Sequence, residues 1–312
     1  MTGKTPRGFM ISAPKKSSGK TTITLGLTGA YTSIGKNVRV FKKGPDYIDP
    51  MWHRASSGNT CYNIDSFWMS DEECKTAFYS RSGDVDLCLL EGNHGLHDGL
   101  NLEGDNSGAH LAKLLNLPVL LVVDSAGMNR GVAAIVLGQQ MMDKDLTIGA
   151  VMLNNVASQR QATKQIKAIE HYCNIPVIGA VPRSDTTGIK ERHLGLVTTY
   201  EDPNVKETIE GLSKTLAENC DLDKLFSIAA PLTGTFSGLT PKRNPTGKKV
   251  KIGIAYDNSF CFYYPENLNA LENEGAELIY FDTLKDQQIP DVDGIYIGGG
   301  FPESFLVELE EN

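Results

Sequence analysis

Short apolar runs alternate with amphipathic stretches from residue 8 to about residue 220. The apolar runs are rich in Val, Ile and Leu and too short for helices, so we predict strands at Gly8–Ser12, Val38–Lys42, Val85–Glu91, Val119–Asp124, Ile148–Asn154 and Val177–Val181. Most are separated by helical patterns, at residues 20–34, 107–116, 130–143 and 160–172, and residues 202–222 resemble a closing helix. Apolar strands separated by helices predict an α/β fold, a mostly parallel sheet with helices on both faces. Ligands bind beyond the carboxyl ends of such strands.

A change in composition divides the chain. Residues 229–249 are rich in Pro and Gly and end in basic residues, so we interpret them as a linker between a domain at 1–228 and a second one at 250–312. The second part repeats the α/β pattern, with strands expected at 251–257, 276–282 and 293–299 and a helix at Pro265–Glu274. About sixty residues bury too little surface for a secure parallel-sheet domain. We therefore expect residues 250–312 to be the incomplete first part of a longer domain.

Charge and composition exclude several classes of function. The 312 residues carry 30 basic and 38 acidic side chains, a formal charge of −8, which argues against generic binding to nucleic acid or anionic membranes. No apolar stretch approaches the roughly 20 residues that a membrane span needs, and we expect a cytoplasmic protein. The six cysteines are scattered without a C-x-x-C pair, so neither zinc nor redox chemistry is indicated.

The segment GFMISAPKKSSGKTT, residues 8–22, predicts a phosphate-binding loop between a strand and a helix. Lys20 would reach the β- and γ-phosphates of ATP, and the Thr21 hydroxyl would hold Mg²⁺. Pro14 replaces the first Gly of G-x-x-x-x-G-K-[ST], and Lys15 resembles the signature lysine of dethiobiotin-synthetase and ParA-like NTPases. The alternative is a surface turn. The loop residues expected to bind nucleotide are Lys15, Lys16, Ser17, Ser18, Gly19, Lys20, Thr21 and Thr22.

Carboxylates follow two further predicted strands. The loop KKGPDYIDPMWH holds Asp46 and Asp49, and its Gly and Pro residues predict irregular backbone. Two carboxylates beside a triphosphate are repulsive unless Mg²⁺ is bound, although both could instead cap turns. Glu91 ends its strand where such NTPases hold Mg²⁺, so the predicted metal set is Thr21, Asp46 and Glu91. His94 and His97, on the glycine-rich loop that follows, are candidates for an anionic substrate rather than zinc.

Eight segments in order carry a family resemblance: APKKSSGKTT, KKGPDYIDP, CYNID, EGNHGLHDG, the strand ends VVD and MLN, VPR with RHLGL, FCFYYPENL and GGGFPE. Together they resemble the cobyrinic acid a,c-diamide synthase family over essentially the whole chain. The resemblance implies a P-loop NTPase-like synthetase domain followed by the start of a flavodoxin-like glutamine amidotransferase domain. It also implies ATP-dependent amidation of the a and c acetate carboxylates of a tetrapyrrole, such as cobyrinic acid, a sirohydrochlorin or siroheme, through an acyl phosphate.

The resemblance also implies roles for residues. Lys20, Asp46, Asp49, Glu91 and Asp98 would be catalytic, with Asp49 and Asp98 positioning the substrate carboxylate or accepting a proton from ammonium. The remaining implied contacts are the choice of acetate by Tyr47 and Ile48, the adenine pocket at Asn154, Pro182 and Arg183, and the macrocycle carboxylates at Arg192 and His193. Asn154 could equally cap a turn.

Two further expectations concern the partners. In the family, the glutaminase cysteine lies well beyond GGGFPE, so we expect this C-terminally truncated chain to use free ammonia at best or to lack activity. For the family as a whole, the resemblance implies glutamine-derived or free ammonia. The resemblance is compatible with a homodimer.

Two alternatives stay open at the level of sequence. A ParA- or MinD-like ATPase that acts through partner binding is favoured by Lys15, but it does not need the DYIDP loop or the appended segment. A relative of dethiobiotin synthetase or cobyric acid synthase would use similar phosphate chemistry on another acid. The sequence does not specify which tetrapyrrole, or which central metal, is used.

Overall fold

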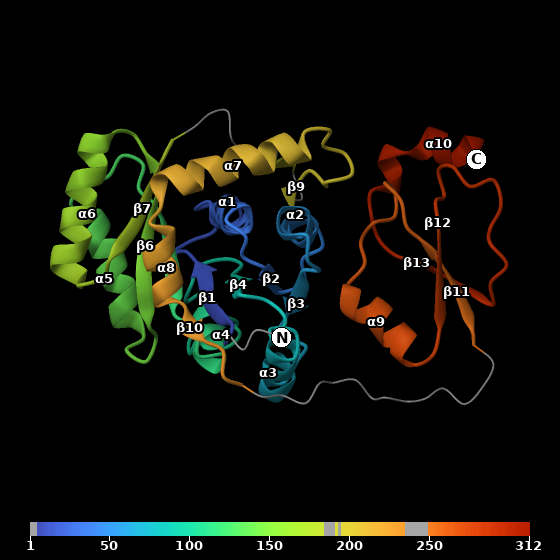
Figure 1. Cartoon of the computed structure of the whole chain (residues 1–312), viewed down its shortest axis with the longest axis horizontal. Coiled ribbons are helices and arrows are strands. Elements are labelled where there is room, and N and C mark those ends of the chain that lie inside the picture. Colours follow the sequence, from blue (N-terminus) through green and yellow to red (C-terminus); the bar gives the residue numbers. More distant parts are fainter. Residues whose placement is uncertain (1–4, 184–190, 193–194, 235–248) are drawn as a thin grey trace. The chain divides into compact units, whose positions relative to one another are not determined.

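The computed structural model describes residues 5–183, 191–192, 195–234 and 249–312. The chain forms two compact units, one from Met1–Val197 with Asn204–Gly238 and one from Thr198–Pro203 with Leu239–Asn312. Each unit has its own parallel sheet with helices beside it, as the labels in Figure 1 show. The α/β class expected from the sequence is therefore confirmed.

The first unit is built on a sheet with the strand order β3-β2-β4-β1-β5-β6-β7. All neighbouring pairs along this path are parallel, and the short β10 joins the start of β1 antiparallel. The strands are β1 (Arg7–Ser12), β2 (Val38–Lys43), β3 (Tyr62–Ile64), β4 (Leu87–Glu91), β5 (Val119–Asp124), β6 (Ile148–Val156), β7 (Val177–Pro182) and β10 (Ala230–Pro231). Because β1 is central, the loop that follows it lies between the ends of β4 and β5.

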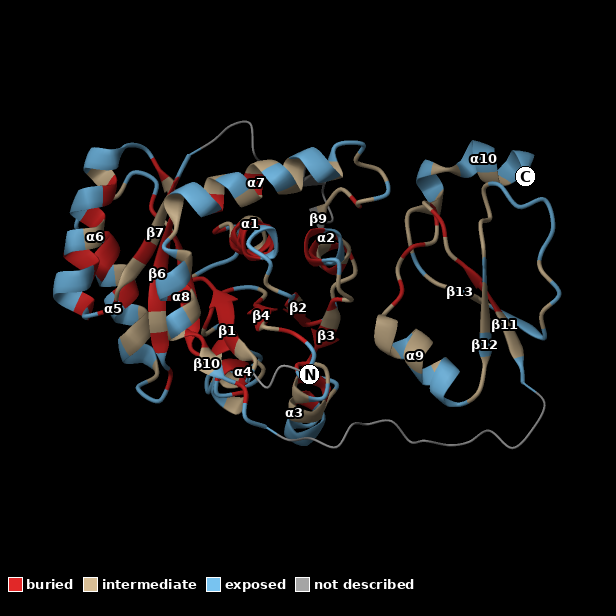
Figure 2. Ribbon diagram, viewed as in Figure 1, coloured by how far each residue is buried: buried red, intermediate tan, exposed pale blue. Residues whose placement is uncertain are grey.

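Helices cover both faces of this sheet, because alternate residues of each strand point to opposite sides. In β1, Phe9 and Ile11 belong to one apolar core, whereas Met10 belongs to the other. Figure 2 shows the strands buried together with α1, whereas outer helices such as α6 and α7 are exposed on one side. The helices are α1 (Lys20–Ser33), α2 (Ile48–Ser57), α3 (Asp71–Tyr79), α4 (Gly108–Leu114), α5 (Val132–Met142), α6 (Gln159–Cys173), α7 (Val205–Asn219) and α8 (Leu222–Ile228).

Helix α1 packs closely against α7, which lies beside it in Figure 1. A Cβ atom at Gly26 would lie 2.6 Å from Leu216 Cδ2, and one at Gly29 would overlap Ser213 Oγ. Only glycine allows this approach at the two positions. Since α1 begins with Lys20, α7 helps to fix the phosphate-binding end of that helix.

Two sequence predictions were wrong in detail. The DYIDP segment is not irregular, because α2 starts at Ile48 and places Pro50 in its first turn, where a missing N–H costs little. Asp46 Oδ1 accepts hydrogen bonds from the backbone N–H groups of Ile48 and Asp49, both at 3.0 Å, and so supports this helix start. The predicted linker starts too early, since β10 pairs with β1. The elements β3, α3 and α8 were not predicted.

The second unit contains a parallel sheet in the order β12-β11-β13. Its elements are β11 (Lys251–Ala255), α9 (Pro265–Asn273), β12 (Glu277–Phe281), β13 (Gly294–Ile297), the 3-10 turn η1 (Pro302–Ser304) and α10 (Leu306–Glu311). Few of its apolar side chains are buried; Ile295 and Ile297 of β13 are about half exposed, at 46% and 56%. This agrees with the small core expected from some sixty residues.

The short strands β8 (Glu191–Arg192) and β9 (Gly195–Leu196) pair antiparallel with each other. Within the described ranges, no helix has the length and apolar character needed to cross a bilayer.

Candidate active site

The loop after β1 has the geometry of a phosphate-binding loop. Ser17 and Gly19 adopt the left-handed conformation, with φ of 57° and 92°, which turns the chain sharply into α1. Ser18 Oγ donates to Lys15 O at 3.0 Å, whereas Lys15, Lys16 and Ser17 are exposed. Thr21 and Thr22 follow in the first turn of α1 and are partly buried. The exposed loop and the helix start can therefore present N–H groups to one anion.

Asn154, near the end of β6, supports this loop by a hydrogen bond. Its Nδ2 atom donates to Ser18 O at 3.0 Å, and a Cβ atom at Gly19 would overlap the same amide group. Asn154 is 8% exposed. This hydrogen bond fixes the loop backbone, and the contact of Asn154 with adenine stays a prediction.

Lys20 lies at the centre of the loop. Its ammonium donates to His94 O at 2.7 Å and to Lys15 O at 3.5 Å, which links the phosphate loop to the loop after β4. Burial lowers the pKa of Lys20 to about 8, and the nearby Glu91 carboxylate offsets part of that effect. A bound phosphate would favour the charged form of this side chain further.

Four polar side chains meet beside Lys20. Thr21 Oγ1 donates to Glu91 Oε1 at 2.7 Å and lies 3.2 Å from Asp49 Oδ2. Lys42 Nζ lies 2.6 Å from the same Glu91 oxygen and also donates to Asp49. These residues come from α1, the end of β2, α2 and the end of β4, so the sheet brings together segments that are far apart in sequence.

Glu91 is fully buried and held on both sides. His53 Nε2 lies 2.7 Å from Glu91 Oε2, and both side chains have no solvent exposure. Burial by itself would raise the pKa of Glu91, but Lys42 and His53 hold that pKa well below its ordinary value. The carboxylate is therefore charged across the physiological range.

The structure differs from the predicted metal set in one member. Asp49, rather than Asp46, meets Thr21 and Glu91. Asp46 uses Oδ1 at the start of α2, and its other oxygen lies 3.9 Å from Lys42 Nζ. Burial, followed by the carboxylate of Asp49, raises the pKa of Asp46. Asp46 lies at the edge of the cluster and Asp49 inside it.

The donor set fits Mg²⁺ in its chemistry. Thr21, Asp49 and Glu91 offer only hydroxyl and carboxylate oxygens, the ligands that Mg²⁺ prefers, and a cationic group already lies among them. Among the residues that the structure describes, no three His, Cys, Asp or Glu side chains form a ready metal cage. Most ligands of a bound magnesium ion would then be water and phosphate, as is usual for this ion.

Lys42 and His53 are the site residues that sequence reasoning missed. A lysine at the end of a buried apolar strand was a usable signal, because Lys is rarely buried without a partner. His53 follows Asp49 by four residues, so on a helix the two share one face. That relation was hidden because the segment was interpreted as irregular.

The loop after β4 contains His94, His97 and Asp98, and hydrogen bonds of this loop fix their positions. Asp98 Oδ2 accepts from Gly95 N at 2.9 Å, and His97 Nε2 lies 3.0 Å from Gln139 O of α5. His94 is exposed with φ of 43°, and its carbonyl holds Lys20. The His97 ring is thus engaged with α5, while Asp98 and His94 lie at the surface of the site.

The remaining predicted residues are dispersed. Ile48 is 8% exposed, whereas the neighbouring Tyr47 is partly exposed, and their role in choosing the acetate stays a prediction. Pro182 ends β7 and is exposed, and Arg183 N donates to Val156 O at 3.0 Å. Arg192 belongs to β8, and His193 lies outside the described residues.

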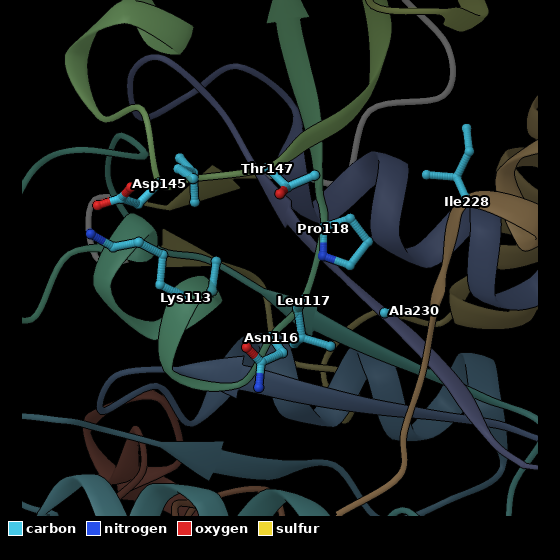
Figure 3. Close-up of a pocket in the computed structure, with 10 residues that line it drawn as sticks. Lys113, Asn116, Leu117, Pro118, Asp145, Thr147, Ile228 and Ala230 are labelled. Carbon is cyan, nitrogen blue, oxygen red and sulfur yellow. The ribbon is translucent and has the colours of Figure 1, made fainter.

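A separate cavity of about 510 Å³ lies at the amino ends of the strands, which we call the amino edge, opposite the carboxyl ends near Lys20. Figure 3 shows Pro118 and Thr147, which directly precede β5 and β6, beside Lys113, Asn116 and Ile228. Ligands of parallel α/β sheets bind at the carboxyl ends of strands. The cavity is therefore not the site defined by Lys20.

Comparison with known proteins agrees with this geometry. Residues 9–196 match the CobQ/CobB/MinD/ParA nucleotide binding domain, and residues 251–312 match the CobB/CobQ-like glutamine amidotransferase domain. The nucleotide binding domain, the glutamine amidotransferase match and the relatives described next together indicate an ATP-dependent, amide-forming enzyme.

The relatives make the assignment more specific. The chain is 45% identical to the cobyrinate a,c-diamide synthase of Magnetococcus marinus, over 98% of this chain and 67% of that protein. It is 43% identical to the enzyme of the same name from Methanobrevibacter smithii, over 97% of this chain and 68% of that protein. The chain belongs to the cobyrinate a,c-diamide synthase family and spans about two thirds of the length of these relatives. Among solved structures, chloroplast FtsY from Physcomitrella patens aligns with a TM-score of 0.44 at 16% identity, covering 67% of this chain and 66% of that one.

Proposed function

We propose that this protein converts the a and c acetate carboxylates of a tetrapyrrole into carboxamides at the expense of ATP. Candidate substrates are cobyrinic acid, a sirohydrochlorin or siroheme, and the ammonia is glutamine-derived or free. The observation that carries the proposal is the convergence of Thr21, Asp49 and Glu91 beside Lys20 on the phosphate-binding loop. The names of the relatives supply the substrate class.

The chemistry explains why such a site is needed. A carboxylate is a poor electrophile, so its oxygen first attacks the γ-phosphorus of ATP, and ADP leaves with the electrons of the broken P–O bond. Ammonia then attacks the carbonyl carbon of the acyl phosphate, and phosphate leaves with the electrons of the C–O bond. The protein must mainly align two anions and reduce their repulsion.

The residues divide this work. The loop N–H groups and Lys20 bind the phosphates, and Thr21, Asp49 and Glu91 would hold Mg²⁺, which reduces the negative charge of the triphosphate. Asp46 remains at the edge of this set. In this proposal Asp98, which is exposed on the loop after β4, accepts the proton that ammonia loses on becoming an amide.

We also propose a division into domains. The synthetase domain covers 1–228 together with β10, and residues 250–312 begin the amidotransferase domain. The glutamine amidotransferase match at 251–312 supports glutamine as one ammonia source. The homodimer and the absence of nucleic-acid and membrane partners stay predictions from the family resemblance and from the charge of −8.

The direct test is mass spectrometry of the products. The protein is incubated with ATP, MgCl₂, ammonium chloride or glutamine, and each macrocycle in turn. We expect a mass change of one hydroxyl replaced by one amino group for each amidated acetate, and none without ATP. Unchanged mass with every macrocycle contradicts the proposal. ATP hydrolysis stimulated only by a protein partner would instead favour a switch ATPase.

A further inference from the structure

Lys42 occupies an unusual position for a lysine. It is the last but one residue of β2, and its side chain is 4% exposed. Its ammonium contacts Asp49 and lies 2.6 Å from Glu91 Oε1 and 3.9 Å from Asp46 Oδ2. The next residue, Lys43, is directed elsewhere and donates to Asn93 Oδ1 at 3.1 Å.

Charge balance explains why an ammonium belongs at this point. Three carboxylates within a few ångströms repel one another strongly in a poorly solvated site, unless a cation lies between them. The Lys42 ammonium lies between these carboxylates and supplies that cation, and His53 contacts the other oxygen of Glu91.

The ligands of this ammonium are also the candidate ligands of a metal ion. The Glu91 oxygen that contacts Lys42 is the one that accepts from Thr21, and Asp49 Oδ2 contacts both residues as well. An ammonium between Glu91 Oε1 and Asp49 Oδ2 neutralises the negative charge that would attract a divalent cation, and it competes for the same oxygens. Binding of one of them therefore weakens binding of the other.

We propose that Lys42 is a resident counter-ion, which keeps Asp49 and Glu91 positioned in the nucleotide-free protein and prevents a divalent cation from binding alone. The cation then enters with the nucleotide, whose phosphate oxygens offer the displaced ammonium new acceptors. Lys42 is then a positioning residue, and the divalent cation binds only together with the nucleotide. The inference rests on the proposed function only in taking the nucleotide to be ATP.

A purely structural ion pair predicts something different. If Lys42 served only stability, its removal would weaken the fold and create no affinity for metal. If it is a counter-ion, its removal leaves a set of oxygen ligands with unbalanced negative charge, and that set attracts a divalent cation. The two roles are therefore separated by metal binding without nucleotide.

The experiment measures Mn²⁺ binding to the nucleotide-free protein, by the loss of the electron paramagnetic resonance signal of free Mn²⁺. We expect Lys42→Met to bind one Mn²⁺ at least roughly tenfold more tightly than the wild type, which corresponds to about 1.4 kcal/mol. Lys43→Met is the matched control, because it removes the adjacent buried ammonium without touching Asp49 or Glu91, and it should bind Mn²⁺ like the wild type. Adding Glu91→Gln to Lys42→Met should abolish the gain.

Two outcomes overturn the inference: Mn²⁺ binding by Lys42→Met no tighter than by the wild type, or an equal gain in the control variant Lys43→Met. If Lys42→Met does not fold without metal, its refolding yield is measured in MnCl₂ and in KCl of equal ionic strength. Recovery in MnCl₂ alone supports the inference, whereas equal recovery, or none, in both salts contradicts it. No tetrapyrrole is present, so failure here leaves the amidation test unaffected.

Discussion

The two edges of the large sheet carry ion pairs of the same length in different surroundings. At the carboxyl edge, Lys42 lies 2.6 Å from Glu91, with side-chain exposures of 4% and 0%. Toward the amino edge, Lys113 lies 2.6 Å from Asp143, with exposures of 39% and 21%. The equal distances do not show which pair interacts more strongly. Water screens the attraction between Lys113 and Asp143. The charges of Lys42 and Glu91 are buried, and contacts with Thr21, Asp49 and His53 compensate for the loss of water around them.

The comparison shows where in the sheet charged side chains are buried at a cost in folding free energy. A buried charge network is expensive to form and is usually no more stabilising than apolar packing of the same volume. The cavity at the amino edge is lined by comparable polar residues without such a network. Buried charge at the carboxyl edge therefore indicates chemistry, and perturbing each edge in turn should give unequal effects.

The largest difference should come from removing one carboxylate at each edge. Glu91→Gln removes the charge that pairs with Lys42 and His53, and we expect ATP-dependent amidation to fall by roughly 100- to 1,000-fold, as for other lost electrostatic groups in active sites. Asp143→Asn should leave the rate within about twofold, because exposed pairs contribute little. Product formation is measured by mass spectrometry, with circular dichroism to verify folding. Equal losses in both variants would invalidate the assignment of the edges.

The next largest effect, on ATP affinity, should come from removing one lysine at each end of the strands. Lys20→Met removes the ammonium of the phosphate loop, and we expect ATP affinity to drop by roughly 10- to 100-fold, the range of a lost charge-assisted hydrogen bond. Lys113→Met is the matched control at the other edge and should bind ATP normally. Isothermal titration calorimetry gives both affinities. Normal binding by Lys20→Met would show that the loop does not hold phosphate.

A smaller effect should appear with pH. The pKa of Lys20 is lowered to about 8 in the free protein, so Lys20 is charged below this value and loses its proton above it. ATP affinity should therefore decline as pH rises through about 8, by no more than roughly tenfold per pH unit for one proton. The burial that lowers this pKa destabilises the fold below about pH 8, and that cost disappears between 8 and 10.5. Titrations of Lys20→Arg, which stays charged, should lack the decline.

The smallest expected effect is at Asn154. Asn154→Ala removes the hydrogen bond to Ser18 O that supports the loop, and a lost neutral hydrogen bond of about 1 kcal/mol corresponds to roughly fivefold weaker ATP binding. Thr147→Ala, in the cavity at the opposite edge, is the control. If Asn154→Ala instead changes affinity for ADP and adenosine equally, the side chain contacts the base after all.

Sequence reasoning predicted the architecture because that architecture depends on short-range patterns. The apolar runs of β1, β5 and β7 match their predicted bounds within one residue at each end, since continuous burial requires continuous apolar sequence. The phosphate loop was predicted because its function needs a particular order of residues. Strand β3, with three residues, was too short to give such a pattern.

The interior of the site was harder to predict, since it depends on which oxygen faces which cation. Asp46 and Asp49 are equivalent in the sequence, and only the start of α2 directs one to cap the helix and the other to meet Thr21. Lys42 and Lys43 are adjacent basic residues that the sequence does not distinguish. In the structure their side chains have different partners, Glu91 for Lys42 and Asn93 for Lys43. Asn154 was predicted from the family resemblance to contact adenine, and its hydrogen bond to the loop backbone was not foreseen.

The close fit of α1 on α7 bears on how this protein is made. Lys20 and Thr21 begin α1, but the helix that covers Gly26 and Gly29 is contributed by residues 205–219. A nascent chain on the ribosome has all the phosphate-binding residues long before that helix emerges. The face of α1 that holds Gly26 and Gly29 therefore stays without its partner helix until residues 205–219 have been synthesised.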